Sequence, residues 1–326
     1  MKSRFAMPLR RTLTLFALLC ASGLADNAAH AETTLRIGDQ KGNARAVMEA
    51  AGVLAGAPYK IEWSEFPAAA PLLEAANAGA IDAGTVGDAP FTFAAAAGVP
   101  IKAIAVTRSK QEGLAVVVPG DSPAHSFKDL IGKHIGTGRG SIGHQLVLAQ
   151  LEANGLKLSD IDLVFLLPSE ANAALMSGAI DAWATWDPYT AQLEVSRGVR
   201  RVADGVGLTP GLNFFFARDD ALADEAKRAA LNDFVGRLAR ARTWGLENLD
   251  SYAATWGQIV GLPREVGVKM YRRGEWRATA IDASVVVDEQ KTIDLYVRFG
   301  LISKRIEASK VVDPIFTPAI VAGAKP

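Results

Sequence analysis

Two short glycine-rich loops carry residue types that could bind a small oxyanion. QKGN runs from Gln40 to Asn43, and RGS runs from Arg139 to Ser141, with helical sequence after each loop. The first N–H groups of a helix are free to donate and carry partial positive charge, and glycine lets a ligand approach the backbone. Lys41 and Arg139 would add charge, and His144, one helical turn after Ser141, could donate to the same anion. Asn43 and Ser141 could each cap the helix that follows or bind the ligand. Ordinary turns between a strand and a helix are the alternative.

Asp88 and Asp187 form a second matched pair, each beside a proline at a helix start. Capping of that helix is the simplest role for both. An ionised carboxylate would repel an anion, so direct contact suits a ligand that carries an amine or a hydroxyl. Gly87 and Trp186 precede the two aspartates, and Trp186 could cover an apolar ligand tail or pack in the core.

The sequence offers little support for catalysis. The glycine loops lack the spacing of a phosphate-binding or dinucleotide-binding loop, and no GxSxG motif occurs. His125 and His134 have no partners at metal-ligand spacing. Paired carboxylates at a cleft could do acid/base work, but no other feature supports it. We therefore expect a binding protein without a cofactor or a metal.

The elements that hold these residues occur twice. GAIDAGTVGDAPF, from Gly79 to Phe91, recurs about 99 residues later as GAIDAWATWDPYT, from Gly178 to Thr190. The loop sequence from Ile37 to Asn43 recurs at nearly the same spacing from Ile135 to Ser141. Each half then has the order strand, loop, helix, helix, strand, turn and helix, which predicts two similar α/β lobes with a cleft between them.

The chain must cross twice between the lobes. We place the first crossing after the strand 114–118 and the return at the aromatic strand 213–217, which makes a pair of hinge strands. The expected boundaries are 1–31 for a signal peptide, 32–117 plus 217–326 for the first lobe and 118–216 for the second. Helical patterns at 221–249, 251–260, 263–272 and 283–299 are expected to pack on the first lobe.

The N-terminus is typical of a secretory signal. Lys2, Arg4, Arg10 and Arg11 precede an apolar run, and Ala29-His30-Ala31 predicts cleavage after Ala31. Cys20 follows a leucine, which disfavours a lipid anchor, and the mature chain then has no cysteine. Without the first 31 residues the net charge is about −3, which argues against a nucleic-acid partner. No later apolar run is long enough to span a membrane, so a soluble mature protein is expected.

Several motifs together resemble one family. IGDQKG, VGDAP, GKHIGTGRGSIGH, DAWATWDPY and DEQKTIDLYVRFGLI are similar to the periplasmic aliphatic sulfonate-binding proteins of ABC importers, within the wider sulfonate, taurine and nitrate group. The resemblance implies a type II periplasmic-binding fold, with two α/β lobes of mixed sheet and helices that close on a ligand. It also implies that the cleft is lined by Gln40, Lys41, Gly42, Gly87, Asp88, Ser141, His144, Trp186 and Asp187.

The chain departs from that family at one loop. The family often has GSSxH where this chain has Ser141-Ile142-Gly143-His144, which puts the head-group contacts in doubt. Arg272 and Arg273 resemble a basic pair near the cleft mouth, with a solvated helix end as the alternative. The expected ligand is an alkanesulfonate; taurine, nitrate, a heterocyclic precursor, or an enzyme on the same fold are the alternatives. The expected partners are an ABC permease with its ATPase, and a monomer is expected.

Overall fold

The computed structural model describes Met1 and residues 32–325. The helices and strands below belong to the unit that begins at Thr33. The predicted signal sequence and its cleavage site lie outside the described residues. Within the described residues, no helix combines the length and the apolar character needed to cross a bilayer.

The first sheet is built around three parallel strands from the first copy of the repeat. Its order is β11-β4-β10-β3-β1-β2. β1 pairs in parallel with both β2 and β3, whereas β10 is antiparallel to β3 and to β4. The strands are β1 (Thr34–Gln40), β2 (Lys60–Phe66), β3 (Ala83–Gly87), β4 (Ile101–Arg108), β10 (Leu212–Arg218) and β11 (Arg277–Thr279).

The second sheet repeats this plan. Its order is β7-β6-β8-β5-β9, with β6 parallel to β7 and β8, and β5 antiparallel to β8 and β9. The duplicated sequence has therefore produced duplicated topology, and the predicted mixed α/β lobes are confirmed. The strands are β5 (Ala115–Val118), β6 (His134–Thr137), β7 (Asp162–Phe165), β8 (Ala182–Thr185) and β9 (Arg200–Asp204).

The two predicted hinge strands do not themselves cross between the sheets. β5 lies wholly in the second sheet and β10 wholly in the first. The connections between sheets are thus residues 109–114 and 205–211, a few residues before the predicted boundaries. The antiparallel neighbour of β3 is β10, and that of β8 is β5; each of these strands follows a crossing from the other sheet. Because β5 and β10 are hydrogen-bonded within their own sheets, the crossings themselves are the connecting segments that precede them.

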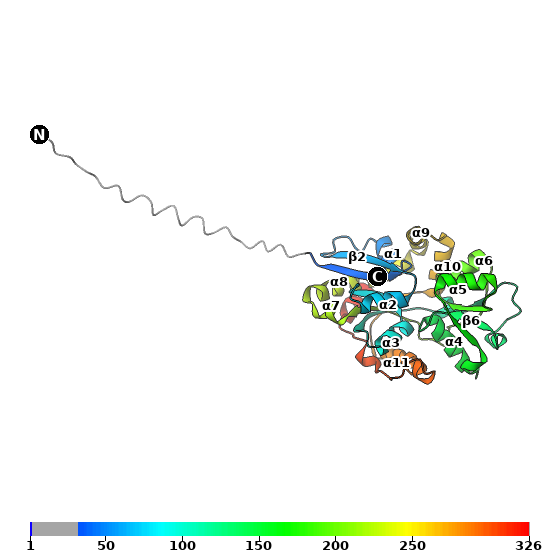
Figure 1. The fold of residues 1–326 in the computed structure, drawn as a ribbon. Coiled ribbons are helices and arrows are strands. Elements are labelled where there is room, and N and C mark those ends of the chain that lie inside the picture. Colours follow the sequence, from blue (N-terminus) through cyan, green and yellow to red (C-terminus); the bar gives the residue numbers. More distant parts are fainter. Residues whose placement is uncertain (2–31, 326) are drawn as a thin grey trace. The chain divides into compact units, whose positions relative to one another are not determined.

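Helices cover both sheets (Figure 1). α3 begins within the first copy of the repeated motif and α6 at the end of the second, and α4 begins directly after the second glycine loop. The helices are α1 (Arg45–Ala50), α2 (Ala69–Asn77), α3 (Asp88–Ala96), α4 (Ile142–Ala153), α5 (Pro168–Ser177), α6 (Tyr189–Arg197), α7 (Asp219–Ala223), α8 (Glu225–Glu247), α9 (Leu249–Val260), α10 (Arg264–Gly274), α11 (Ala283–Arg298) and α12 (Thr317–Gly323), with short 3-10 turns η1 (Gln111–Gly113), η2 (Phe127–Leu130), η3 (Leu158–Asp160) and η4 (Ala308–Lys310).

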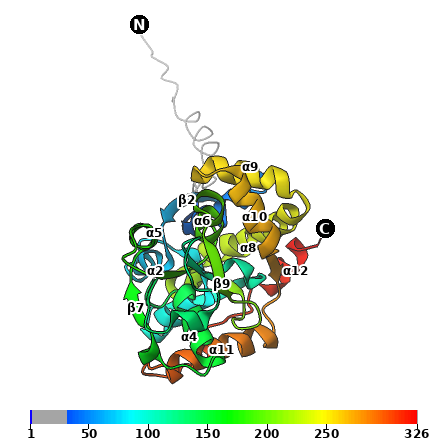
Figure 2. The same ribbon diagram turned by 90° about the vertical axis from the view of Figure 1, so that its right-hand side faces the viewer.

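The C-terminal helices do more than extend the first lobe. α8 packs against strands of the first sheet, as predicted, and so does α12, for which we had no expectation. α10 packs on α9 and also contacts α6 of the second half, and α11 contacts both α3 and α4. Figure 2 shows α9 and α10 at the top and α11 at the bottom of the view. Ile293 and Tyr296 of α11 are fully buried in one apolar cluster with Leu146 of α4, because α11 presents an apolar stripe to both halves. These two helices therefore tie the lobes together.

Candidate functional site

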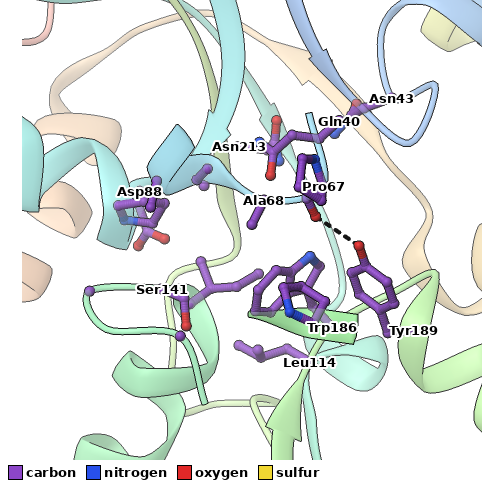
Figure 3. A pocket seen from close by; sticks show the side chains of 18 of the residues that line it. Gln40, Asn43, Pro67, Ala68, Asp88, Leu114, Ser141, Trp186, Tyr189 and Asn213 are labelled. Carbon is purple, nitrogen blue, oxygen red and sulfur yellow. Dashed lines mark hydrogen bonds between the residues drawn. The ribbon is translucent and has the colours of Figure 1, made fainter. Parts of the chain in front are cut away.

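A cavity of about 520 Å³ lies between the two sheets and draws its wall from both halves. Most of the residues predicted at a ligand line it: Gln40, Lys41, Asn43, Gly87 and Asp88 from the first half, and Arg139, Ser141, Trp186 and Asp187 from the second. Gly42 and His144 are not among its lining residues. In Figure 3, Asp88 and Ser141 lie toward one side of the pocket, and Trp186, Leu114 and Tyr189 lie toward another.

The starts of α3 and α4 meet at the polar side of this cavity. Gly87 is the N-cap residue of α3 and Ser141 that of α4, and both line the cavity. A Cβ atom at Gly87 would lie 2.5 Å from Cγ2 of Ile142, so the absence of a side chain lets the two helix starts approach each other. Two helix dipoles consequently present their positive ends to one space.

The second glycine loop is held from behind by His144. Its ring is buried, and its Nδ1 accepts a hydrogen bond of 3.1 Å from the backbone N–H of Gly140. Burial, with help from the charge of Arg139, lowers the pKa of His144 to about 4, so the ring is neutral at pH 7. The ring therefore supports the loop through Nδ1, and the contact of His144 with the ligand stays a prediction.

Ser141 and Arg139 complete this second loop. The Ser141 hydroxyl oxygen accepts a hydrogen bond of 3.2 Å from the N–H of His144, which confirms its predicted capping role. The Arg139 side chain is exposed, and its guanidinium lies 4.0 Å from the centre of the Phe165 ring. The loop therefore offers one exposed cation and one hydroxyl to the cavity.

The first glycine loop is anchored differently. The carboxylate of Asp39 accepts from the N–H groups of Ala44 and Arg45, at 3.0 and 2.9 Å, and so caps α1 from within β1. Asn43, the predicted cap, instead accepts a hydrogen bond from Arg242. Gly42 has a φ of 67° and packs beneath the loop, where a Cβ would lie 2.9 Å from Val260. Asn43 as the N-cap is therefore wrong, and Gly42 serves the turn.

Gln40 and Lys41 lie at the edge of the cavity. The Gln40 side-chain amide donates to the carbonyl of Thr85 at 2.7 Å, which fixes the side chain across β3. The backbone carbonyl of Lys41 accepts from the indole N–H of Trp256 at 3.0 Å, so the backbone of the loop is tied to α9. The Lys41 side chain also lines the cavity.

Asp88 is fully buried and is bound by neutral donors. Its Oδ2 accepts from the Gln145 amide of α4 at 3.0 Å and from the Thr292 hydroxyl of α11 at 2.8 Å. Burial raises the pKa of Asp88 above its ordinary value. No side-chain hydrogen bond caps α3, so the predicted capping role of Asp88 is wrong. Asp88 instead joins the first half to α4 and α11.

Asp187 is bound by a cation. Arg273 of α10 donates from Nε to Asp187 Oδ2 at 2.8 Å and also bonds Oδ1, and it reaches Glu194 of α6 at 2.7 Å. Asp187 also accepts from the N–H of Ala191 in the first turn of α6 at 3.0 Å, which agrees with its predicted capping role. Arg273 is therefore a buried ion-pair partner, and the solvated helix end considered for it is wrong.

The other side of the cavity is apolar. A hydrogen bond joins the two halves there. Trp186 packs edge-on against Tyr189, and Leu114 and Ala68 face the same space (Figure 3). The Tyr189 hydroxyl donates to the carbonyl of Pro67 at 2.7 Å. Sequence reasoning identified Trp186 and missed the rest, although Tyr189 stands three residues after it in the repeated motif.

Further lining residues come from segments with no motif of their own. Asn213 and Trp276 border the cavity from β10 and from the start of β11, and neither has an equivalent in the repeat. Within the described residues, no cluster of three or more His, Cys, Asp or Glu side chains is arranged to hold a metal ion.

Two sheets with reciprocal crossings and a cleft lined from both halves define the class of the type II periplasmic-binding fold. The family model described as "NMT1/THI5 like" matches residues 64–244. An aliphatic sulfonates-binding protein of Escherichia coli K12 is 33% identical over 300 residues, which cover 90% of this chain and 93% of that one. The chain belongs to the NMT1/THI5-like family, in its group of aliphatic sulfonate-binding proteins.

Solved structures agree with this assignment. The alkanesulfonate-binding protein SsuA of Xanthomonas axonopodis pv. citri, bound to MOPS, matches with a TM-score of 0.80 and 33% identity, covering 87% of this chain and 99% of that one. The desulfurization enzyme DszB matches with a TM-score of 0.67 and 16% identity over 90% of this chain and 100% of its own. The likeness to DszB concerns the fold alone.

Proposed function

We propose that this chain is the substrate-binding component of an ABC importer and that it captures an aliphatic sulfonate in the cleft. The observation that carries the proposal is the division of one cavity into two chemical parts. Two helix starts lie at one side, and Trp186, Leu114 and Tyr189 lie at the other. A sulfonate head with an alkyl tail has the same division.

The head group would lie at the start of α4. The first N–H groups of this helix are free of intrahelical partners, and the helix dipole favours an anion there. The Ser141 oxygen accepts the cap bond and lies 3.4 Å from the Thr137 hydroxyl oxygen, so its proton could go to that oxygen or to an anion in the cleft. Lys41 and Arg139 would add charge from the two halves, and His144 would act by holding Gly140 in place.

The tail would lie along Trp186. Its ring faces Leu114 and Ala68, so methylene groups placed between these side chains are removed from contact with water. Asp88 is already satisfied by Gln145 and Thr292, which limits its repulsion of a sulfonate. A ligand with an ammonium or hydroxyl group, such as taurine, would be the alternative that Asp88 favours.

Capture by closure follows from the shared wall. A ligand that touches both halves binds the closed arrangement more tightly and so shifts the population toward it. The hydrogen bond from Tyr189 to Pro67 would form with closure and add a contact between the halves.

Location and partners are proposed on the same basis. The basic and apolar N-terminal sequence ending at Ala31 supports export to the periplasm, as do the relatives in this group. The closed receptor would deliver its ligand as a monomer to a membrane permease with its ATPase.

Thermal-shift measurements on the mature chain test the ligand. Octanesulfonate, hexanesulfonate and methanesulfonate are compared with taurine, nitrate and sulfate at equal concentration. We expect at least one alkanesulfonate to raise the midpoint, because a ligand that binds only the folded state stabilises it. A rise in the midpoint with taurine or nitrate alone would make that compound the ligand in place of an alkanesulfonate. No rise with any sulfonate would refute the assignment.

An enzyme is the second candidate, because DszB shares this fold. The described residues of the cleft include no cysteine, and His144 is committed to the loop behind it. We therefore expect no turnover. Mass spectrometry of the stabilising sulfonate after prolonged incubation with the protein checks this, and release of sulfite or a desulfonated product would contradict a pure receptor.

A further inference from the structure

Arg242 is a buried cation whose partners are incomplete. It lies in the middle of α8 and is only 3% exposed. Its Nη2 donates to the amide oxygen of Asn43, a neutral acceptor. Among the described residues, its Nε and Nη1 have no hydrogen-bond partner. A buried charge in such surroundings is costly, so its retention needs a reason.

The aromatic neighbours of Arg242 include Trp276 and Tyr252, and Arg242 borders a second cavity that Glu275 also lines. Its guanidinium lies 5.5 Å from the centre of the Trp276 ring. Its charge opposes the effect of burial on Tyr252, whose pKa burial nevertheless raises to about 12. The buried carboxylate of Asp39 acts on the pKa of Tyr252 in the opposite sense to Arg242, and its own hydrogen bonds come from the N–H groups of Ala44 and Arg45. No described carboxylate hydrogen-bonds to Arg242.

Arg242 lies directly behind the cleft wall. Asn43, which it bonds, lines the cleft, and so does Trp276, whose ring it approaches. Asn213 lines the cleft as well, and it shares a small internal cavity with Arg242. Three separate wall residues thus adjoin Arg242, which does not itself line the cleft.

We infer that Arg242 is a fixed counter-charge for the anionic ligand, acting through the first-lobe wall of the cleft and orienting Asn43 toward it. The inference rests on the proposed function. A buried cation that is hydrogen-bonded to no described carboxylate interacts favourably with a sulfonate that enters the cleft, and protein atoms screen this attraction less than water does. Arg242 is thereby a positioning residue that does not touch the ligand.

This role predicts opposite effects on binding and on the stability of the empty protein. In Arg242→Met, calorimetry should give a dissociation constant for hexanesulfonate about tenfold higher than in the wild type. The unfolding midpoint without ligand should stay level or rise, because a costly buried charge has been removed. Arg242→Lys retains the charge and should bind within about threefold of the wild type. Arg242→Gln provides a second neutral side chain if the methionine variant does not fold.

Arg237→Met is the matched control on the same helix. Arg237 bonds Asp233 and the carbonyl of Val53, away from the cleft, so its loss should lower the midpoint and leave the dissociation constant unchanged. Unchanged binding by the neutral variants would overturn the inference, and so would equal losses in Arg242→Lys and Arg242→Met. A wild-type protein that binds no sulfonate would refute the proposed function instead.

Discussion

The two glycine loops begin at equivalent places in the two halves, and they are anchored by different residues. In the first loop the cap comes from Asp39, which lies inside β1, whereas its equivalent in the second half, Thr137, donates to the carbonyl of Ala184. In the second loop Ser141 provides the cap, whereas its equivalent, Asn43, bonds Arg242. A repeated backbone therefore does not require repeated contacts.

The two aspartates of the repeat differ in the same way. Asp88 is held by the amide of Gln145 and the hydroxyl of Thr292, and Asp187 is held by the guanidinium of Arg273. One carboxylate is thus compensated by neutral donors and the other by a full charge. The comparison shows that segments outside the repeat decide how much charge each half presents to the cleft, and the following variants test it.

The largest effect on stability is expected at Asp187, the aspartate that is paired with a cation. Arg273→Met would leave Asp187, whose side chain is only 5% exposed, without its cation, whereas Glu194 would keep Arg201 and Lys269. We expect a loss of about 3–5 kcal/mol in the free energy of unfolding, measured with urea. The double variant Arg273→Met/Asp187→Asn should lose less than the single one. Equal losses would mean that the unpaired charge of Asp187 is not the cause of the destabilisation.

The anchor of the first loop should appear in the pH dependence of stability. Burial, followed by the charge of Glu65, raises the pKa of Asp39 from its ordinary 3.8 to about 7. The folded state then binds the proton more tightly than the unfolded state does. This contribution is complete below about pH 4 and is lost as pH rises to about 7.

Asp39→Asn removes that titration. Between pH 4 and 7 the wild type should lose stability relative to this variant by about 1.4 kcal/mol per pH unit, since native Asp39 keeps a proton that the unfolded chain releases. Urea unfolding at several pH values measures the slope. Thr137→Val, at the equivalent place in the second half, should run parallel to the wild type. A constant difference between the wild type and Asp39→Asn would show that Asp39 is ionised throughout.

Gly87→Ala tests the close approach of the two helix starts. The new Cβ would meet Ile142 at 2.5 Å, and overpacking of this kind costs roughly 1–3 kcal/mol. The dissociation constant for hexanesulfonate should therefore rise about tenfold, as measured by calorimetry. Ile142→Ala in the same chain should recover most of the affinity. Failure of that rescue would place the cost elsewhere than at this contact.

Trp186→Ala is expected to have the smallest effect and the most selective one. Loss of the ring should weaken octanesulfonate about fivefold more than methanesulfonate, because only the longer tail reaches the apolar part. Trp63→Ala is the control, since Trp63 packs against Phe234 away from the cleft. Equal weakening of both ligands would assign Trp186 to packing alone.

The two-lobed architecture and most of the ligand wall could be predicted from the sequence. The recurrence of the motif at Gly79 and Gly178 is a local signal, and local propensity and periodicity are enough to place its strands and helices. The same signal led to Ser141 and Trp186, which both line the cavity. It failed for Asn43 and Asp88, because a residue that can cap a helix can equally accept a donor from another segment.

What the sequence by itself determined is thus a duplicated backbone with a polar loop at equivalent points of a cleft. The tertiary structure alone decided which charges that cleft meets. Arg273 lies 86 residues from the aspartate it binds, and Arg242 lies 199 residues from Asn43. Both arginines come from C-terminal helices that carry no copy of the repeat. Their partners depend on how these helices pack on segments far away in the sequence, and packing between distant segments leaves no periodic trace in the sequence.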